Sequence, residues 1–254
     1  MERSLDTPET AHGRDATPYG FLPTLPRQSR GRTTQRVQEI IREAIVALSF
    51  APGEFIQKEA ICHRLGVSRF PVSEALGRLA DEGFVEILPQ RGTRVTRIDV
   101  ASCRQALFIR HALEGEAVRV IAGRANPELI GRLDENLAEQ KLAVGRSDAG
   151  AFFQLDLAFH DILLSELGYD RVKTVVEAAR GSLDRMRLFL LRTPQRVVQS
   201  HSEHATIVDA LKARDPDAAQ QAMRQHLDNA MDEIELRATE NPAMFAQGAA
   251  SRRA

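Results

Sequence analysis

The sequence lacks several features that define other protein classes. Only two of its 254 residues are cysteine, and it contains no run of about 18 apolar residues. Cys62 and Cys103 both fall in apolar helical patterns, which argues against a disulfide framework. Without a membrane-spanning run or an N-terminal apolar signal segment, we expect a cytoplasmic protein with no membrane partner. The hydrophobic content of 43% suffices for real cores, and the length favours two domains.

A strong excess of either charge is also missing, since the formal net charge is -1. The charge is nevertheless uneven along the chain. Residues 27–97 carry 12 Lys or Arg against 8 Asp or Glu, whereas the segments on both sides are net acidic. This basic excess predicts that residues 27–97 contact a polyanion such as a nucleic acid.

Helical and strand patterns divide the N-terminal part into an ordered series. Residues 1–32 hold four prolines and no apolar period, which predicts a disordered arm. A helical period begins at Thr33, a short second helix follows, and Ser68 can cap a third helix that tolerates Pro71 in its first turn. "FVEIL" and "TRVTRI" then alternate as a hairpin around "PQRG". This order predicts a winged helix-turn-helix over residues 33–98, whose second motif helix lies in the DNA major groove.

Arginines gather at the two places where such a domain meets DNA. Arg69 begins the third helix, where its guanidinium fork matches the O6 and N7 acceptors of guanine. Arg91 and Arg94 flank the hairpin tip and supply charge for phosphates or a narrow minor groove, while Gly92 lets the backbone approach closely. The alternative is a small helical domain with solvated arginines, which this clustering disfavours.

The stretch "GVSRFPVSEALGRLADEGFVEILPQRGTRV", preceded by "APGEFI", resembles the N-terminal domain of GntR-type bacterial transcription regulators. The resemblance implies DNA contacts at Arg69, Arg78, Arg91 and Gly92. Ser73 stands at a DNA-facing position where the family usually has Arg, and Gly77 stands where a basic or polar residue is common. Both departures shorten the side chains of the exposed face, so we expect an operator preference that differs from that of close relatives.

The apolar residues of 99–238 recur almost throughout at helical spacing. The period is interrupted at Asn126-Pro127, 146–151, Gly168, Thr193-Pro194 and Asp215-Pro216. These breaks predict about six helices in an all-α bundle, so the whole chain is expected to be mainly α. Residues 239–254 lose the period, which predicts a flexible tail.

One set of polar residues in this bundle suits a metal ion. Asp156 and His160 are four apart, which places them on the same face of a helix. His204 and His226 lie on two other predicted helices, among apolar residues expected to face the core. Three imidazoles and a carboxylate that converge would bind a divalent metal such as zinc and leave coordination positions open. Two other interpretations stay open: a solvated Asp-His pair, and core histidines held by hydrogen bonds.

"RHALEGEAV", "DLAFHDILLSELG", "EHATIVDAL" and "QHLDNA" make the bundle similar to the FCD ligand-sensing domain, the C-terminal half of the FadR-like subfamily. The resemblance is to its metal-binding type, and the predicted helix count favours the six-helix VanR-like variant over the seven-helix one. It implies a divalent metal, zinc with nickel or manganese as alternatives, on Asp156, His160, His204 and His226. It also implies that Arg110 receives an effector carboxylate. Tyr169 replaces an Asn that is common after the Asp-His helix, so we expect a phenol in the pocket and a different or bulkier effector.

These expectations combine into a DNA-binding transcriptional repressor rather than an enzyme. A homodimer would place two recognition helices on a pseudo-palindromic double-stranded operator, and a small organic acid bound by the metal and Arg110 would change operator affinity. One rival is a metal-dependent enzyme whose site activates water, but no nucleophile motif or further general base lies near the motif. The other is a regulator that senses the metal itself. A ligand set without cysteine, together with Arg110, favours an organic anion as the signal.

Overall fold

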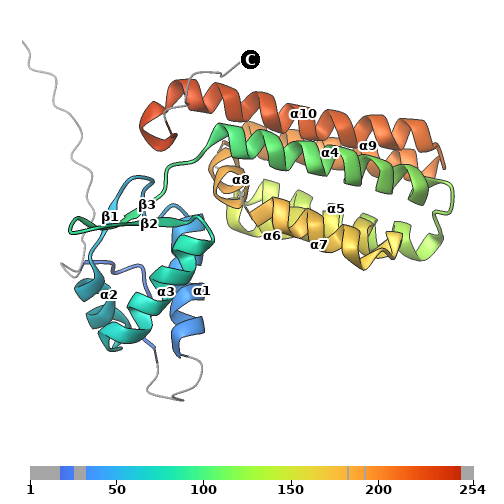
Figure 1. Cartoon of the computed structure of the whole chain (residues 1–254). Helices are drawn as coiled ribbons and strands as arrows, with labels where there is room; N and C mark the ends of the chain where they lie inside the picture. The colour runs from blue at the N-terminus through green and yellow to red at the C-terminus, as the bar shows by residue number, and fades with distance from the viewer. Residues whose placement is uncertain (1–17, 26–32, 182, 192, 247–254) are drawn as a thin grey trace, which may run out of the picture. The chain divides into compact units, whose positions relative to one another are not determined.

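The computed structural model describes residues 18–25, 33–181, 183–191 and 193–246, which fold into two compact units (Figure 1). The first unit contains most of the chain up to Val95, and the second runs from Thr96 onward and also takes in Ile45–Gly53. As expected from the sequence, the fold is mainly helical. Among the described helices, none is long and apolar enough to cross a membrane.

The first unit is a winged helix-turn-helix. Its helices are α1 (Thr33–Val46), α2 (Lys58–Leu65) and α3 (Arg69–Asp81), and its strands are β1 (Phe55–Ile56), β2 (Val85–Leu88) and β3 (Gly92–Val95). The strands form an antiparallel sheet in the order β1-β3-β2. The predicted helices and hairpin are therefore present. β1 is an addition that the sequence pattern cannot indicate, because two residues are too short to show alternation.

A short turn sets α3 against α2. Gly66 ends α2 with a φ of 69°, in the left-handed region that favours glycine. Ser68 occupies the N-cap position of α3 in an extended conformation, as predicted, although its side chain makes no capping hydrogen bond. Val72, Leu76 and Leu79 are almost fully buried. Their burial fixes one face of α3 in the core and leaves the opposite face exposed.

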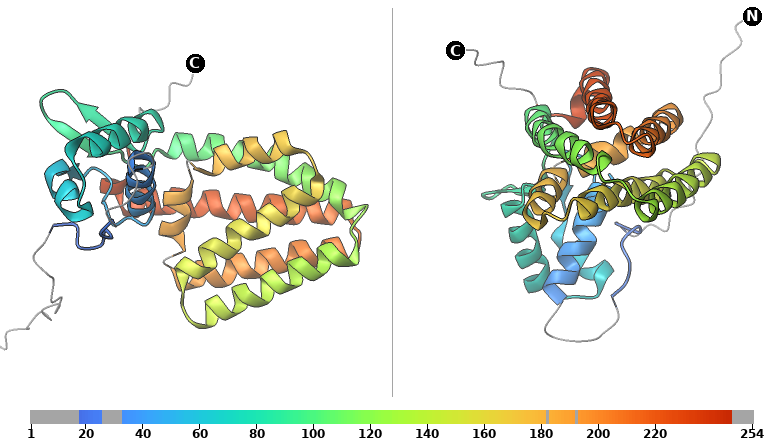
Figure 2. Two further views of the ribbon diagram at one scale, coloured as in Figure 1. Left: turned by 90° about the horizontal axis from the view of Figure 1, so that it is seen from below. Right: turned by 90° about the vertical axis from the view of Figure 1, so that its right-hand side faces the viewer.

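The second unit is a bundle with seven α-helices among its described residues (Figures 1 and 2). They are α4 (Val100–Ala122), α5 (Pro127–Gly145), α6 (Ala149–Leu167), α7 (Asp170–Gly181), α8 (Asp184–Leu190), α9 (Pro194–Lys212) and α10 (Pro216–Glu240), followed by a 3-10 turn, η1 (Pro242–Met244). α4 packs mainly against α10, and α9 lies between α10 and α5. Asx caps mark several helix starts: the side chains of Asp99, Asn126, Asp148 and Asp215 each accept a backbone N–H of the first turn.

The helix count is seven rather than the predicted six. The segment between Gly168 and Pro194 was expected to form one helix, but it holds both α7 and α8. α7 ends at Gly181, a residue type that weakens helices. An isolated glycine within an apolar period is not by itself a stop signal, so the sequence does not indicate this break. The division matters because α8 carries Arg187 to the polar centre described below.

Two segments predicted to lack structure are partly folded. Residues 18–25 belong to the predicted disordered arm, yet Leu22 is 1% exposed, and its carbonyl oxygen accepts a 2.6 Å hydrogen bond from Arg64 Nε. In the predicted tail, Phe245 is buried and forms a β-bridge with Ile98. A buried apolar residue lies in each segment, and a single buried residue has no periodic signature. The rest of the arm and of the tail lies outside the described residues.

Candidate functional site

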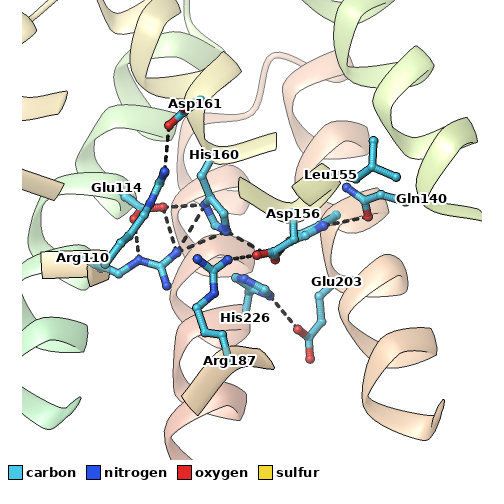
Figure 3. A network of polar contacts seen from close by, with 12 residues as sticks. Arg110, Glu114, Gln140, Leu155, Asp156, His160, Asp161, Arg187, Glu203 and His226 are labelled. Atoms are coloured by element: carbon cyan, nitrogen blue, oxygen red, sulfur yellow. Dashed lines mark hydrogen bonds and ion pairs between the residues drawn. The ribbon is translucent and has the colours of Figure 1, made fainter. Parts of the chain in front are cut away.

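Four buried side chains of the bundle converge on one point, and Figure 3 labels three of them, Asp156, His160 and His226. Asp156 and His160 come from α6, His204 from α9 and His226 from α10. Each offers one ligand atom, and these atoms lie within 4.8 Å of one another. None of the four residues is more than 4% exposed. The structure thus brings together the four residues that the sequence singled out as metal ligands.

Packing along α6 fixes this arrangement. The four-residue spacing puts Asp156 and His160 one turn apart on the same buried face. Phe159, which precedes His160, stacks on the imidazole of His204 with ring centroids 4.1 Å apart and planes within 15°. An apolar side chain of α6 therefore orients a polar ring of α9.

The three imidazoles share one arrangement of their nitrogens. Nδ1 of each ring lies close to an oxygen: 2.6 Å from Glu114 Oε2 for His160, 2.9 Å from Gln140 Oε1 for His204, and 2.7 Å from Glu203 Oε2 for His226. Because these oxygens can only accept, each neutral ring donates from Nδ1 and keeps a lone pair on Nε2. Nε2 of His204 is buried, lies 3.5 Å from Asp156 Oδ1, and has no hydrogen-bond partner among the described residues. A metal ion would satisfy this lone pair.

The three oxygen acceptors are themselves held in place. Arg110 Nε donates to Glu114 over 2.6 Å, Gln140 Nε2 donates to Asn136 over 2.7 Å, and Arg196 donates to both oxygens of Glu203 over 2.9 and 3.2 Å. Since the amide nitrogen of Gln140 is committed to Asn136, its oxygen must face His204. The contacts behind the rings therefore select the tautomer that turns every Nε2 toward the centre.

Burial keeps the three rings neutral. Desolvation lowers the pKa of His160 and of His226 to about 4 and holds the pKa of His204 well below its usual range. Glu114 and Glu203 raise the pKa of their partner rings, but less than burial lowers it. Near neutral pH the rings are thus in the unprotonated form that binds metal ions.

Guanidinium groups surround the same centre. Arg187 forms an ion pair with Asp156, and Arg110 Nη2 lies 3.2 Å from His160 Nε2. Burial and then the charge of Arg110 lower the pKa of Arg187. A cavity of about 30 Å³ adjoins these groups, and its polar lining consists of Arg110, Asp156, Arg187, Arg196, Ser200 and His226. Arg110, Arg187 and Arg196 are each paired with a carboxylate, so an anionic ligand would have to share or displace one of these pairs.

The two residues predicted to bind an effector differ in position. Arg110 is 2% exposed and lines the cavity. Tyr169 is 62% exposed and does not line it, so its predicted place in the pocket is wrong. Gly168 ends α6 with a φ of 76°, and this left-handed turn takes the chain away from the buried face before α7 begins.

Sequence reasoning missed five polar residues around the centre: Glu114, Gln140, Arg187, Arg196 and Glu203. Spacing could have indicated two of them, because Glu114 lies four residues after Arg110 and Glu203 directly precedes His204. Arg196, Gln140 and Arg187 gave no such signal, and the last two lie on helices that carry no ligand. These two reach the site from α5 and α8, which only the tertiary structure brings to α6.

The exposed face of α3 carries the residues predicted to read DNA. The side chains of Arg69 and Arg78 are 78% and 50% exposed, and Ser73 is exposed between them. Each arginine forms a surface ion pair, with Glu59 at 3.3 Å and with Glu74 at 3.7 Å. Such pairs contribute little and exchange readily for another anion. Phe70, beside Arg69, is 74% exposed as well.

The hairpin residues fall into two groups. Arg91 and Gly92 are exposed at the turn between β2 and β3, where Gly92 has a φ of 102°. Arg94 is half-buried, donates from Nε to Glu86 over 2.7 Å, and lies over the ring of Phe55. Arg94 thus holds the sheet together, whereas Arg91 extends from its tip.

Comparison with known proteins accounts for both units. Residues 33–95 match the gntR family of bacterial regulatory proteins, and residues 105–229 match the FCD domain. An HTH-type transcriptional regulator in an unstable DNA locus of Streptomyces ambofaciens is 36% identical over 88% of this chain and 94% of its own length. The chain is a GntR-family transcriptional regulator. Its winged helix-turn-helix is the DNA-binding domain, and its FCD bundle is the ligand-binding domain.

Further relatives agree with this assignment. The HTH-type transcriptional repressor RspR of Escherichia coli strain K12 is 32% identical to the regulator over 84% of its chain and 93% of RspR. The crystal structure of a GntR transcriptional regulator from Rhodococcus sp. RHA1 superposes with a TM-score of 0.68, at 24% identity, over 80% of this chain and 97% of the other. The regulator therefore has the fold of that protein, and its domain combination fits the FadR-like subfamily.

Proposed function

We propose that the regulator is a repressor that binds a pseudo-palindromic operator as a homodimer. A small organic acid, bound at a divalent metal in the FCD domain, changes its operator affinity. The buried group of Asp156, His160, His204 and His226 carries this proposal, because its donor atoms converge and its rings have their lone pairs turned inward. The Escherichia coli relative RspR is a transcriptional repressor by name, which supports the direction of control.

Zinc fits this donor set best, with nickel and manganese as the alternatives. Three imidazole nitrogens and one carboxylate oxygen are ligands that borderline divalent metals accept, and no thiolate is among them. When bound, the ion would act as a Lewis acid toward an oxygen of the effector. Three neutral rings and one carboxylate leave the ion with about one unit of positive charge, so the filled site attracts an anion.

On the DNA side, we propose that the exposed face of α3 enters the major groove. Arg69 would read a guanine, and Phe70 beside it would contact a thymine methyl group, since apolar contact with that methyl is a direct way to read the base. Arg78 and Arg91 would bind phosphates, and Gly92 would let the wing approach the backbone. Ser73 is too short to read a base at the position where the family usually has Arg.

The effector would act through linkage between the two domains. It changes operator affinity only as far as it prefers one arrangement of the dimer over another, and such couplings are typically about 1 to 3 kcal/mol. The three arginines that line the cavity, as donors for a carboxylate, favour an acid as the signal over the metal alone. An enzymatic role for the metal gains no support from the relatives, which are regulators of transcription.

The test uses the full-length protein and operators selected from random DNA. We expect about one zinc per chain by elemental analysis, and an operator affinity that changes with small carboxylic acids. Asp156→Ala should lose both properties. His201→Ala is the matched control, because His201 lies on α9 near His204 but bonds to the Leu137 carbonyl oxygen instead. If chelation alone releases the operator and acids have no effect, the metal is the signal. If wild type and Asp156→Ala behave alike, the site is not a metal site.

A further inference from the structure

Arg187 contacts a residue that would also bind the metal ion. Its side chain is 10% exposed and forms an ion pair with Asp156, one of the four candidate ligands (Figure 3). Its other terminal nitrogen, Nη1, is buried and has no hydrogen-bond partner among the described residues. A buried guanidinium with one unsatisfied donor is costly unless an anion meets it.

The other two guanidiniums of the cavity are already engaged with carboxylates. Arg110 donates to Glu114, and Arg196 donates to both oxygens of Glu203. Neither carboxylate belongs to the candidate ligand set, so a metal ion leaves both pairs intact. Arg187 is different, because its partner Asp156 is a candidate ligand. Oδ2 of Asp156 pairs with Arg187 and Oδ1 lies toward the Nε2 atoms of His160 and His204, so an ion on Oδ1 would draw charge from the same carboxylate and weaken the pair. Filling the metal site thus weakens the counter-ion of Arg187 and of no other arginine of the lining.

We propose that Arg187 binds the effector carboxylate. Without metal, Arg187 is the internal counter-ion of Asp156. With metal on Asp156, its fork can donate two hydrogen bonds to a small carboxylate, one oxygen of which can also meet the ion. This inference rests on the proposed function, since it needs both a metal and an acid.

The cavity is so small that a ligand would have to replace an existing side-chain contact in order to fit. About 30 Å³ holds water but no organic acid. An acid therefore needs the space that Arg187 frees when it leaves Asp156. Binding becomes ordered, with the metal first and the acid second, and each tightens the other by linkage.

Arg110, the residue that the resemblance indicated, has another role in this structure. Its guanidinium holds Glu114, which accepts from His160 Nδ1 over 2.6 Å. Loss of Arg110 should therefore disturb a metal ligand as well as the cavity. Loss of Arg187 removes only a competitor for Asp156 and should leave the metal site able to fill. This difference separates the two arginines by experiment.

The experiment titrates full-length, metal-stripped protein with zinc against a competing chelator, with and without excess acetate, and with acetamide as the neutral control. In wild type, acetate should tighten zinc binding by about five- to hundredfold, and acetamide should not. Arg187→Met should bind zinc at least as tightly as wild type and lose the acetate effect. Arg187→Lys keeps the charge without the fork, so it should fold, bind zinc and lose most of the acetate effect. Arg110→Gln should bind zinc more weakly even without acetate.

The outcomes separate this inference from the proposed function. If wild type binds zinc no better than Asp156→Ala does, the metal site is contradicted. The proposed function and the role of Arg187 are then both wrong. Two results would overturn only the role of Arg187, provided that zinc binding depends on Asp156. In the first, acetate has no effect on zinc binding by wild type. In the second, the acetate effect is undiminished in both Arg187 variants. Arg187→Met and Arg187→Lys that both lose zinc would show that Arg187 is structural, which also overturns it.

Discussion

Glu203 directly precedes His204 on α9 and accepts, over 2.7 Å, the Nδ1 hydrogen bond of His226 on α10. One short stretch of α9 therefore supplies a candidate ligand and also orients the ligand of a neighbouring helix. Glu203→Gln keeps an acceptor but loses the charge that makes the His226 ring more basic. We expect zinc affinity to fall by about 10- to 100-fold. Competition titration measures this fall, and Glu139→Gln on the exposed face of α5 is the matched control. Equal affinities would show that Glu203 does not support the site.

His204→Ala should lower metal content and thermal stability together. Only the native state presents all four ligands, so bound metal stabilises it, by about 2.7 kcal/mol when free metal is at a hundred times its Kd. Elemental analysis and the melting temperature with and without chelator test this. Chelation should lower the melting temperature of wild type and leave that of His204→Ala unchanged. Full metal occupancy in His204→Ala would remove His204 from the ligand set.

The metal-free protein should lose stability in mild acid. The pKa of His160 and of His226 is about 4 in the folded chain, against about 6.5 for an unperturbed ring. Between these values the unfolded chain binds more protons, so the free energy of unfolding falls as pH falls from about 6.5 toward 4. The slope is at most about 1.4 kcal/mol per pH unit for each ring. Urea unfolding across this range measures it, and His226→Gln should show a shallower slope. Identical slopes in both proteins would contradict the assignment.

Two arginines of the DNA-binding domain should contribute to DNA binding in different ways. Arg69→Ala should lower specific operator affinity by roughly 1 to 3 kcal/mol and relax the preference at one base position. Arg91→Ala should weaken specific and random DNA alike and flatten the salt dependence, as expected for a phosphate contact. Binding to both DNA classes over a range of salt concentrations separates the two. An equal loss on specific and random DNA for Arg69→Ala would exclude base reading.

Phe70 provides a test at the level of a single methyl group. If its exposed ring contacts a thymine, replacing that thymine by deoxyuridine should weaken wild-type binding, because only the methyl group is lost. Phe70→Ala should bind both operators equally. Deoxyuridine is substituted at each thymine in turn, and the affinities are compared in a double-mutant cycle. Wild type that is indifferent to every substitution would leave Phe70 without a role in readout.

The winged helix-turn-helix could be predicted from sequence because its signals are local. Gly66 and Ser68 mark the turn, and the stripe of Val72, Leu76 and Leu79 marks the buried face of α3. The position of Arg94 could not be predicted, since its partner Glu86 lies across a strand pair and Phe55 belongs to β1, which is too short to show a pattern.

The candidate site was predictable in its ligands but not in its surroundings. Asp156 and His160 share a helix face by spacing alone. His204 and His226 were placed on two other predicted helices by their apolar neighbours, and the family resemblance supported grouping all four. Tyr169 was placed wrongly because the motif stops at Gly168, whose left-handed turn changes the direction of the chain. Arg187 carries no local signal, as its contact with Asp156 joins two helices that spacing cannot relate.

The short helix α8 joins this centre to the start of the bundle. Arg187 faces Asp156, whereas Arg185, two residues earlier, donates to the Thr96 carbonyl oxygen over 2.8 Å and to the Thr96 hydroxyl over 3.1 Å. Thr96 directly follows β3 in the chain. Residues two apart project from roughly opposite sides of a helix, so α8 has one charged contact on each side. A helix of two turns moves as one piece. We therefore expect a change of partner at Arg187 to alter the hydrogen bonds that Arg185 donates to Thr96, the first residue after β3.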